Sequence, residues 1–510
     1  MAFLQGLDSH IVIVGCGISG LGAAMRLVQH GFHKVRIVEA TGRAGGRIKT
    51  TLWGGKFVEI GANWIHGPCQ ENPVFRLACD YHLLDEKSMT EENQSIDVEG
   101  HPPFVPNWFT SSGQKVSVGM TEPASMLYMK LLQESQEFSV EDQEVLPTSS
   151  VGEFIKCKAK QALDEEQVDK TTKDLKQAVI NTLLKAECCV SGTHSMDDVC
   201  LRAFGMYKTL PGLDCTFPGG YEGLIRCMAQ DLPKDIVSYN KPVKCIHWNC
   251  TDQNSSSSEK RLPVLVECED GEKIPADHVI LTVSLGFLKR NHKTLLNPEI
   301  PPHKVQSIQN LGFGTNNKIF LEFEEPFWDP DCEIIFFLWE DEPELTDVVS
   351  NLDIFWMKKL FGFTVMTPAE RYGHVLCGWI AGHESEHMET LSQVELECTI
   401  TRLIRRFTGN PTITPKRVLR SQWYHDPYTY GSYTYIAKGC SGQDIDNLVE
   451  PLPLKGSQSK PLQVLFGGEA TNRSFFSTVH GALLAGWREA ERLISHYAPS
   501  TFPEACSSKL

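Results

Sequence analysis

Three glycines near the N-terminus have the spacing of a phosphate-binding turn. Gly15, Gly17 and Gly20 follow a short apolar segment at 11–14 and open a run of small residues typical of a helix. A second apolar segment ends at Glu39, an acid 19 residues after Gly20. This strand, glycine turn, helix and strand indicate a dinucleotide site in which the helix N-terminus holds a pyrophosphate. Glu39 can accept hydrogen bonds from ribose hydroxyls, which argues against a 2′-phosphate and hence against NADP.

A second phosphate-binding element follows directly. Residues 41–50, TGRAGGRIKT, place Arg43 and Arg47 on either side of the pair Gly45-Gly46. Two guanidinium groups beside a glycine pair can neutralise a diphosphate where the backbone runs close to it. The stretch resembles the R-x-G-G-R-x-x-S/T element of flavoproteins with the glutathione-reductase type of FAD fold, which NAD dehydrogenases do not usually carry. We therefore expect FAD as the cofactor.

Lys318 is a further candidate for chemistry. The stretch GTNNKIFLEFEEPFW at 314–328 alternates as a strand, with Ile319 and Leu321 on one face and Lys318 and Phe320 on the other. A lysine at the beginning of a strand is most often a solvated end. The alternative is a buried amine with a chemical role, and the choice depends on what the rest of the chain builds around it.

Composition limits the classes of partner. The chain has 510 residues, enough for two or three domains, and a formal net charge of −16. No Lys/Arg block is present, so nucleic acid and anionic membranes are not expected partners; the acidity favours cationic ligands or simply solubility. The 17 cysteines form no C-x-x-C pair, which argues against a metal site or a disulfide framework and favours reduced thiols inside the cell.

The two ends of the chain predict a compartment. The sequence MAFLQGLDSH lacks the basic and apolar regions of a secretory signal, and no apolar run is long enough to span a bilayer. The last three residues, Ser508-Lys509-Leu510, match a peroxisomal address that an import receptor reads. We expect a protein of the peroxisomal matrix, with a cytoplasmic pool also possible in principle.

With these elements aligned, the sequence resembles the flavin amine oxidases over nearly its whole length. The residues that carry the resemblance, besides the FAD elements and Lys318, are Gly61-Ala62-Asn63-Trp64, FPGGYEGL from Phe217, CGWIAGHESE at 377–386, and Gly467-Gly468-Glu469 through Gly481. Within the family, GANWIHG together with the terminal SKL resembles the peroxisomal branch that oxidises N-acetylated polyamines.

The resemblance implies an α/β fold with two domains. One is a Rossmann-type, glutathione-reductase-like FAD-binding domain made of residues 1–84, 217–300 and 450–498. The other is an α+β substrate domain made of residues 85–216 and 301–449, and residues 499–510 form a tail that carries the targeting signal. A monomer is expected.

The expected cofactor site draws on the first, middle and last segments. Its residues are Gly15, Gly17, Ile18, Ser19, Gly20, Glu39, Ala40, Arg43, Gly45, Gly46, Arg47, Gly61, Ala62, Asn63, Trp64, Val243, Trp423, Gly468, Glu469, Thr478 and Val479. By resemblance Val243 contacts the adenine through its backbone, and the helix that begins near Thr478 stabilises negative charge on the reduced flavin. The stretch at 423–435 contains no cysteine for covalent attachment, and Cys440 and Cys506 lie outside any such motif, so FAD is expected to be noncovalent.

Amine oxidation needs a neutral reacting nitrogen in an apolar, aromatic cavity, with acceptors farther away for a second, charged nitrogen. By resemblance Lys318 lies beside the flavin N5 through a water and is catalytic together with His66. Phe320, on the same face of the strand, would then line the cavity. Trp64 and Trp379 are expected at the ring. The expected substrate-binding residues are His66, Glu187, Asp214, Tyr430, Tyr433 and Thr478, although each aromatic residue also suits core packing and each carboxylate also suits a solvated loop. Oxygen is the expected electron acceptor and a polyamine the expected substrate.

Three alternatives stay open. One is a spermine oxidase acting on unacetylated amine. A second is a monoamine oxidase, which would carry an attachment cysteine and a C-terminal membrane helix. The third is a binding protein on the same fold, such as the GDP-dissociation inhibitors, which the intact Arg43/Arg47 element and Lys318 disfavour. Histone demethylases of the family have an extra N-terminal domain, for which a first strand near His10 leaves no room.

Overall fold

The computed structural model describes residues 6–96, 104–138, 148–250 and 262–498. Segments distant in sequence meet in one parallel sheet. Its strands, in the order β20-β11-β1-β2-β7, are Val464–Phe466, His278–Leu281, Ile11–Val14, Val35–Val38 and Val237–Ser238. All four residues of β1 are buried, as expected for a parallel strand covered on both faces.

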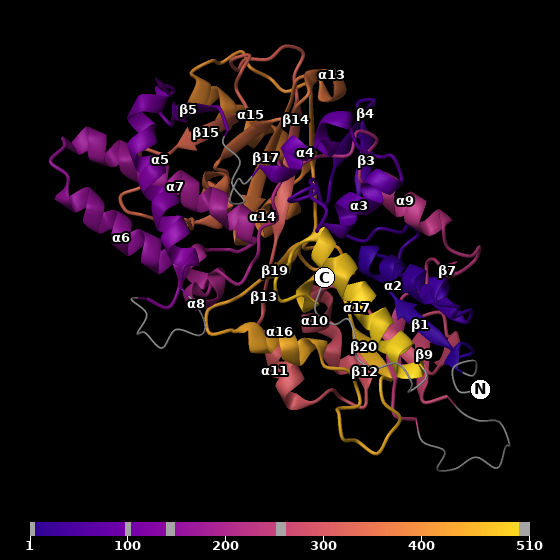
Figure 1. Cartoon of the computed structure of the whole chain (residues 1–510). Helices are drawn as coiled ribbons and strands as arrows, with labels where there is room; N and C mark the ends of the chain where they lie inside the picture. The colour runs from indigo at the N-terminus through magenta and orange to yellow at the C-terminus, as the bar shows by residue number, and fades with distance from the viewer. Residues whose placement is uncertain (1–5, 97–103, 139–147, 251–261, 499–510) are drawn as a thin grey trace.

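Two helices from opposite ends of the chain lie side by side against this sheet (Figure 1). They are α2, Ile18–Gln29, and α17, Val479–Tyr497. Their backbones approach closely because Gly486 has no side chain: a Cβ at this position would lie 2.0 Å from the Ser19 carbonyl oxygen. The close packing joins the first and last segments into one unit.

A second, smaller sheet packs next to the parallel one. Its strands, in the order β10-β9-β8-β12, are Lys273–Ala276, Val264–Cys268, Val243–His247 and Leu296–Asn297. Helices α10 (Leu285–Leu295), α11 (Pro302–Asn310) and α16 (Gly442–Val449) share a hydrophobic core with it and with β20.

The largest sheet is mixed and has seven strands. In the order β18-β14-β17-β16-β15-β5-β6 they are Arg417–Arg420, Asn316–Glu322, Val375–Ala381, Gly362–Val365, Ile334–Leu338, Pro106–Thr110 and Lys115–Val116. Figure 1 shows α5 (Val118–Gln136), α6 (Val151–Glu165) and α7 (Lys170–Ser191) beside this sheet. Helix α15, Gln393–Thr408, packs on the face of β14 that carries Ile319 and Leu321.

The remaining elements are short. The strands are β3 (Thr50–Trp53) paired with β4 (Lys56–Glu59), and β13 (Gly312–Gly314) paired with β19 (Tyr433–Tyr435). The helices are α3 (Pro73–Asp80), α4 (Glu91–Ser95), α8 (Leu201–Phe204), α9 (Glu222–Gln230), α12 (Leu352–Phe355), α13 (Ala369–Tyr372) and α14 (Gly382–Thr390). Single 3₁₀ turns are η1 (Glu86–Met89), η2 (Met196–Asp198), η3 (Trp356–Lys359) and η4 (Glu469–Thr471).

The predicted domain boundaries can be compared with these sheets. The parallel sheet takes its strands from 1–84, 217–300 and 450–498, and the seven-stranded sheet takes its strands from 85–216 and 301–449. Helices α11 and α16 were assigned to the substrate domain, yet they pack with β20, so the boundaries at 300 and 450 stay predictions. The targeting tripeptide Ser508-Lys509-Leu510 lies outside the described residues. No helix in the described part of the chain is long and apolar enough to cross a membrane.

Candidate active site

A continuous cavity of about 2030 Å³ connects the parallel sheet with the seven-stranded sheet. Its walls contain every cofactor and substrate residue predicted from sequence except Gly20. Gly20 packs against the backbone of the glycine turn and does not line the cavity. A Cβ at this position would lie 2.1 Å from the Gly15 carbonyl oxygen. The cavity therefore collects residues from four distant parts of the chain.

One end of the cavity is a glycine cradle at the beginning of α2. Gly15 has a φ of +103°, and Gly17 is the N-cap of the helix. No side chain in the described structure caps this helix, which leaves its first N–H groups available to an anion. Gly45 donates its N–H to the Cys16 carbonyl oxygen at 2.8 Å and brings the second glycine loop against the first.

Glu39, directly after β2, is held in place at the same edge of the sheet by three hydrogen bonds, one of them from the Thr41 hydroxyl at 2.8 Å. Its Oε2 accepts the Cys16 N–H at 2.8 Å, and its Oε1 accepts the Thr41 N–H at 2.9 Å. The carboxylate is thus fixed against the cavity wall with lone pairs left over, which suits the predicted contact with ribose hydroxyls.

The two arginines supply positive charge to the site and also fix its backbone through hydrogen bonds. Arg43 donates to carbonyl oxygens of its own loop, at 3.1 Å for Ala44 and 3.0 Å for Ile48. Arg47 donates to the Glu469 carboxylate at 2.7 Å and to the Ser432 carbonyl oxygen at 2.8 Å. The sequence predicted neutralisation of a diphosphate by both side chains; the structure adds that their hydrogen bonds first fasten the loops together.

Lys318 is buried at the centre of the cavity wall, so its interpretation as a solvated strand end is wrong. Its Nζ donates to the carbonyl oxygens of Glu59 and Gly61, both at 2.7 Å, and lies 3.4 Å from Asn63 Oδ1. Burial lowers the pKa of Lys318 to about 8. Two of its three protons form short bonds with carbonyl groups, and the third is donated to Asn63 Oδ1 in a longer bond, which is the one that the predicted water or a reacting species would displace.

The aromatic residues expected at the ring surround Lys318. Its Nζ lies 4.6 Å from the centre of the Trp379 ring. Trp379 stacks on Trp64, with ring centres 5.4 Å apart. The prediction that Phe320 lines the cavity is wrong, because the β3–β4 hairpin covers that side chain, which is fully buried and packs near Trp53.

His66 and Asp214 form a pair in the cavity wall. His66 Nδ1 lies 2.6 Å from Asp214 Oδ2, and Asp214 Oδ1 accepts the Gly67 N–H at 3.1 Å. Burial by itself lowers the pKa of His66, but the charge and hydrogen bond of Asp214 outweigh it, so that the pKa is raised. Each oxygen of Asp214 has a partner within the protein, and the carboxylate fixes the orientation of His66; its role as an anchor for a remote ammonium group stays a prediction.

Glu187 and Tyr433 occupy another part of the wall. Glu187, near the end of α7, is buried and accepts the Ser191 hydroxyl at 3.2 Å. The Tyr433 hydroxyl donates to the Cys189 carbonyl oxygen and accepts from Asn316 Nδ2 at 2.7 Å. Asn316 was missed from sequence, although it lies two residues before Lys318 on the same face of the strand, where alternation could have found it.

Other predicted residues have additional neighbours. Tyr430 lies beneath the guanidinium group of Arg290, which is 4.0 Å from its ring centre. Thr478 is the N-cap of α17 and accepts the Gly481 N–H at 2.9 Å, so its hydroxyl serves the helix as well as the cavity. Trp423 donates its indole N–H to the Ile60 carbonyl oxygen at 3.2 Å.

Comparison with known proteins decides the family. The family described as flavin containing amine oxidoreductase matches residues 18–494. The chain belongs to this family of flavin amine oxidases. It is 51% identical over 502 residues to "Peroxisomal N(1)-acetyl-spermine/spermidine oxidase" of Bos taurus, covering 98% of this chain and 97% of that protein. The human protein of the same name is 51% identical over 491 residues, covering 96% and 95%.

More distant members share the whole length too. "Polyamine oxidase 1" of Oryza sativa subsp. japonica is 32% identical over 522 residues, covering 96% of this chain and 97% of that protein. A solved structure of a putrescine oxidase double mutant superposes with a TM-score of 0.68 at 20% identity, covering 96% and 99%. The predicted family, α/β fold class and FAD cofactor of this flavin amine oxidase are confirmed.

The cavity fits FAD at two helix N-termini, those of α2 and α17. A Cβ at Gly17 would meet nothing closer than the Gly45 carbonyl oxygen, at 4.0 Å, so that the space in front of the helix is free for a diphosphate. The N–H groups of Val479 and His480 open α17 at the other end, where a helix N-terminus favours negative charge. Gly468 donates its N–H to Ser19 Oγ at 3.0 Å and ties these two ends together.

Proposed function

We propose that this enzyme oxidises N-acetylated polyamines, N-acetylspermine and N-acetylspermidine, with O₂ and water to a shorter polyamine, 3-acetamidopropanal and H₂O₂, as a step of polyamine catabolism. The relatives that are 51% identical over almost the whole chain are named for this pair of substrates, which supports the proposal most. The buried Lys318, which donates to the Gly61 carbonyl oxygen and lies over the Trp379 ring, also supports the proposal.

Each group of the cavity has a part in the proposed reaction. FAD supplies the acceptor for the hydride equivalent that leaves the carbon beside nitrogen. Trp64 and Trp379 provide an apolar surface on which the reacting nitrogen is bound neutral, because a charged nitrogen would be costly to desolvate there. His66, oriented by Asp214, accepts a hydrogen bond or proton from that nitrogen through Nε2. Glu187 binds a remote ammonium group.

The preference for acetylated substrates is the first expected result. An acetyl cap removes one charge, which lowers the desolvation cost of entering a cavity whose wall includes Trp64, Trp379 and Tyr433. N-acetylspermine should therefore give a higher kcat/KM than spermine in a panel of amines followed by peroxide release. Should unmodified spermine be the better substrate, the enzyme is a spermine oxidase; should no amine yield peroxide, the proposed function fails.

Noncovalent attachment of FAD is the second expected result. Among the described residues, Cys189 is the cysteine in the cavity wall, and burial raises the pKa of its thiol, which disfavours the reactive thiolate. Acid denaturation should release all the yellow cofactor into the supernatant. Flavin absorbance that remained with the precipitated protein would show a covalent bond and contradict the prediction.

The proposed compartment is the peroxisome, with import through Ser508-Lys509-Leu510. The names of the relatives and the terminal tripeptide support this location. A monomer that works in the matrix with a smaller cytoplasmic pool completes the proposal. Peroxide formed by the reaction would then arise where peroxisomal enzymes remove it.

A further inference from the structure

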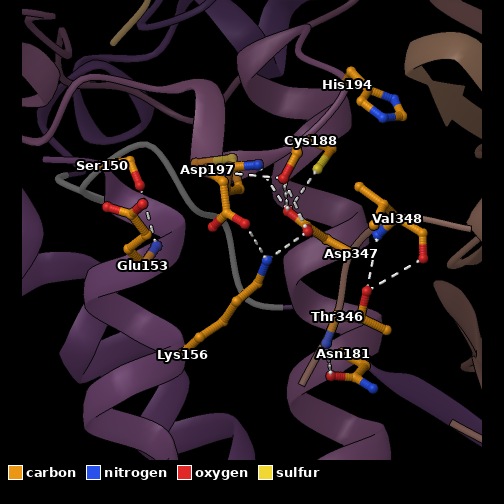
Figure 2. A network of polar contacts seen from close by, with 12 residues as sticks. Ser150, Glu153, Lys156, Asn181, Cys188, His194, Asp197, Thr346, Asp347 and Val348 are labelled. Carbon is orange, nitrogen blue, oxygen red and sulfur yellow. Dashed lines mark hydrogen bonds and ion pairs between the residues drawn. The ribbon is translucent and has the colours of Figure 1, made fainter. Parts of the chain in front are cut away.

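A buried polar network lies directly behind the last turn of α7 (Figure 2). Its centre is the carboxylate of Asp347, which is 0% exposed. This carboxylate accepts hydrogen bonds from Lys156 Nζ at 2.7 Å, the Met196 N–H at 2.7 Å and the Ser195 hydroxyl at 3.0 Å. The Cys188 thiol, on α7 itself, lies 3.5 Å from the second carboxylate oxygen.

A second buried charge, Lys359, binds the segment that follows α7 and contacts Cys188 in its last turn. Its Nζ donates to the carbonyl oxygens of Asp347 and of His194, the latter at 2.5 Å, and lies 3.7 Å from Cys188 Sγ. Burial opposes ionisation of Asp347, but the nearby lysines outweigh it and lower its pKa to about 2. For Lys359 burial is likewise outweighed by its anionic neighbours, and its pKa is raised to about 12. Both groups therefore stay charged across the neutral range.

The opposite side of the same helical turn faces the cavity. Glu187 and Cys189, on either side of Cys188, belong to the cavity wall. Asn316 Nδ2 donates to the Cys189 carbonyl oxygen at 3.1 Å, and the Tyr433 hydroxyl donates to that oxygen as well. The last turn of α7 therefore contacts the buried charged network on one side and residues of the cavity wall on the other.

Stability alone is a weak reason for these charges. Replacing a buried ion pair by apolar residues of similar volume is often neutral or stabilising, because desolvation offsets most of the attraction. A network that satisfies each charge in one geometry does, however, fix the position of the backbone that it binds. Here that backbone is the segment 194–196 directly after α7, and the Cys188 thiol joins the network to the helical turn that carries Glu187.

We propose that Asp347 and Lys359 are positioning residues that fix the last turn of α7 and so hold the Glu187 carboxylate where it selects ligands with a second, remote cationic group. The inference rests on the proposed function, in which Glu187 binds that group. It predicts that removing a charge from the network lowers the ratio of the affinities for dicationic and monocationic ligands. This ratio should change more than any other property of the cavity.

A matched pair of buried lysines provides the test. Lys304 also lies fully buried and donates to backbone carbonyl oxygens at the end of a helix, at 2.5 Å for Asn447 and 2.6 Å for Glu450, but it is not part of the cavity wall. Lys359→Met and Lys304→Met should both lower the melting temperature. Binding of 1,8-diaminooctane and of octylamine to each FAD-loaded variant is measured by calorimetry.

In the wild type the diamine should bind more tightly than the monoamine. Lys359→Met should reduce this ratio of affinities roughly tenfold, whereas Lys304→Met should leave it unchanged. Glu187→Gln should abolish the preference, and adding Lys359→Met to it should cause no further loss, because both act on one contact. A ratio that survives Lys359→Met overturns the proposal.

Two further results separate the possible failures. If Lys359→Met does not fold, Ser195→Ala removes one neutral donor to Asp347 and keeps every charge; it should lower the ratio in the same direction, and an unchanged ratio overturns the proposal. If the wild type shows no preference for the diamine, the remote anchor fails and the positioning proposal with it. If it prefers the diamine but oxidises no amine, the proposed function alone fails.

Discussion

Replacement of Lys318 by methionine is expected to slow the reaction of the reduced enzyme with oxygen by roughly ten- to a thousandfold. The Lys318 ammonium group is buried and fixed by two carbonyl oxygens at 2.7 Å, so its charge acts without the screening that water provides. Reduction of oxygen builds negative charge that such a cation stabilises. Hydride removal from a neutral amine builds little charge that needs it, so that half-reaction should change much less.

Rapid-mixing measurements should follow the two half-reactions separately. Because burial lowers the pKa of Lys318 to about 8, the cation is present below this pH and is lost above it. The wild-type oxygen reaction should therefore slow as the pH rises through about 8, and Lys318→Met should lack this dependence. Lys304→Met, which also removes a buried lysine, serves as the control. Wild-type oxygen rates in Lys318→Met would show that the cation has no such role.

The parts of the site that depend on residues close together in the sequence could be predicted correctly. The strand, glycine turn and helix at 11–29 follow one another along the chain, and each glycine is needed within that short stretch. Strand alternation likewise placed Lys318 and Phe320 on one face correctly. It could not show that the β3–β4 hairpin covers Phe320, because the hairpin is formed by residues more than 250 positions away.

The contacts that give the site its chemistry are almost all remote. The acceptors of Lys318 are 259 and 257 residues before it, and Asp214 is 148 residues after His66. No sequence motif has a fixed spacing over such distances, so these contacts could not be predicted from the sequence. Composition alone left Asp214 equally suited to a solvated loop and to a substrate anchor. The Asp347 network was missed for the same reason, since Asp347 and Cys188 are 159 residues apart.

Replacement of Gly17 by alanine is expected to leave the fold intact and to weaken FAD retention at least about tenfold. Gly17 has φ −73° and ψ 177°, a conformation that alanine adopts without strain. A Cβ at this position would find its nearest neighbour in the chain at 4.0 Å, so the protein itself has room for the methyl group. That room is where the diphosphate approaches the helix, and the methyl group would hold it away from the backbone N–H groups.

Gly20→Ala is the matched control, because its Cβ would lie 2.1 Å from the Gly15 carbonyl oxygen and must disturb the turn itself. The melting temperature of the flavin-free protein should therefore fall for Gly20→Ala and stay within a few degrees of wild type for Gly17→Ala. The ratio of flavin to protein absorbance should fall for both. Since a ligand at free concentration L stabilises the folded protein by RT ln(1 + L/Kd), added FAD should raise the melting temperature of wild type more than that of Gly17→Ala, which has the larger Kd. Full flavin content in Gly17→Ala would mean that the diphosphate does not approach the helix at this glycine.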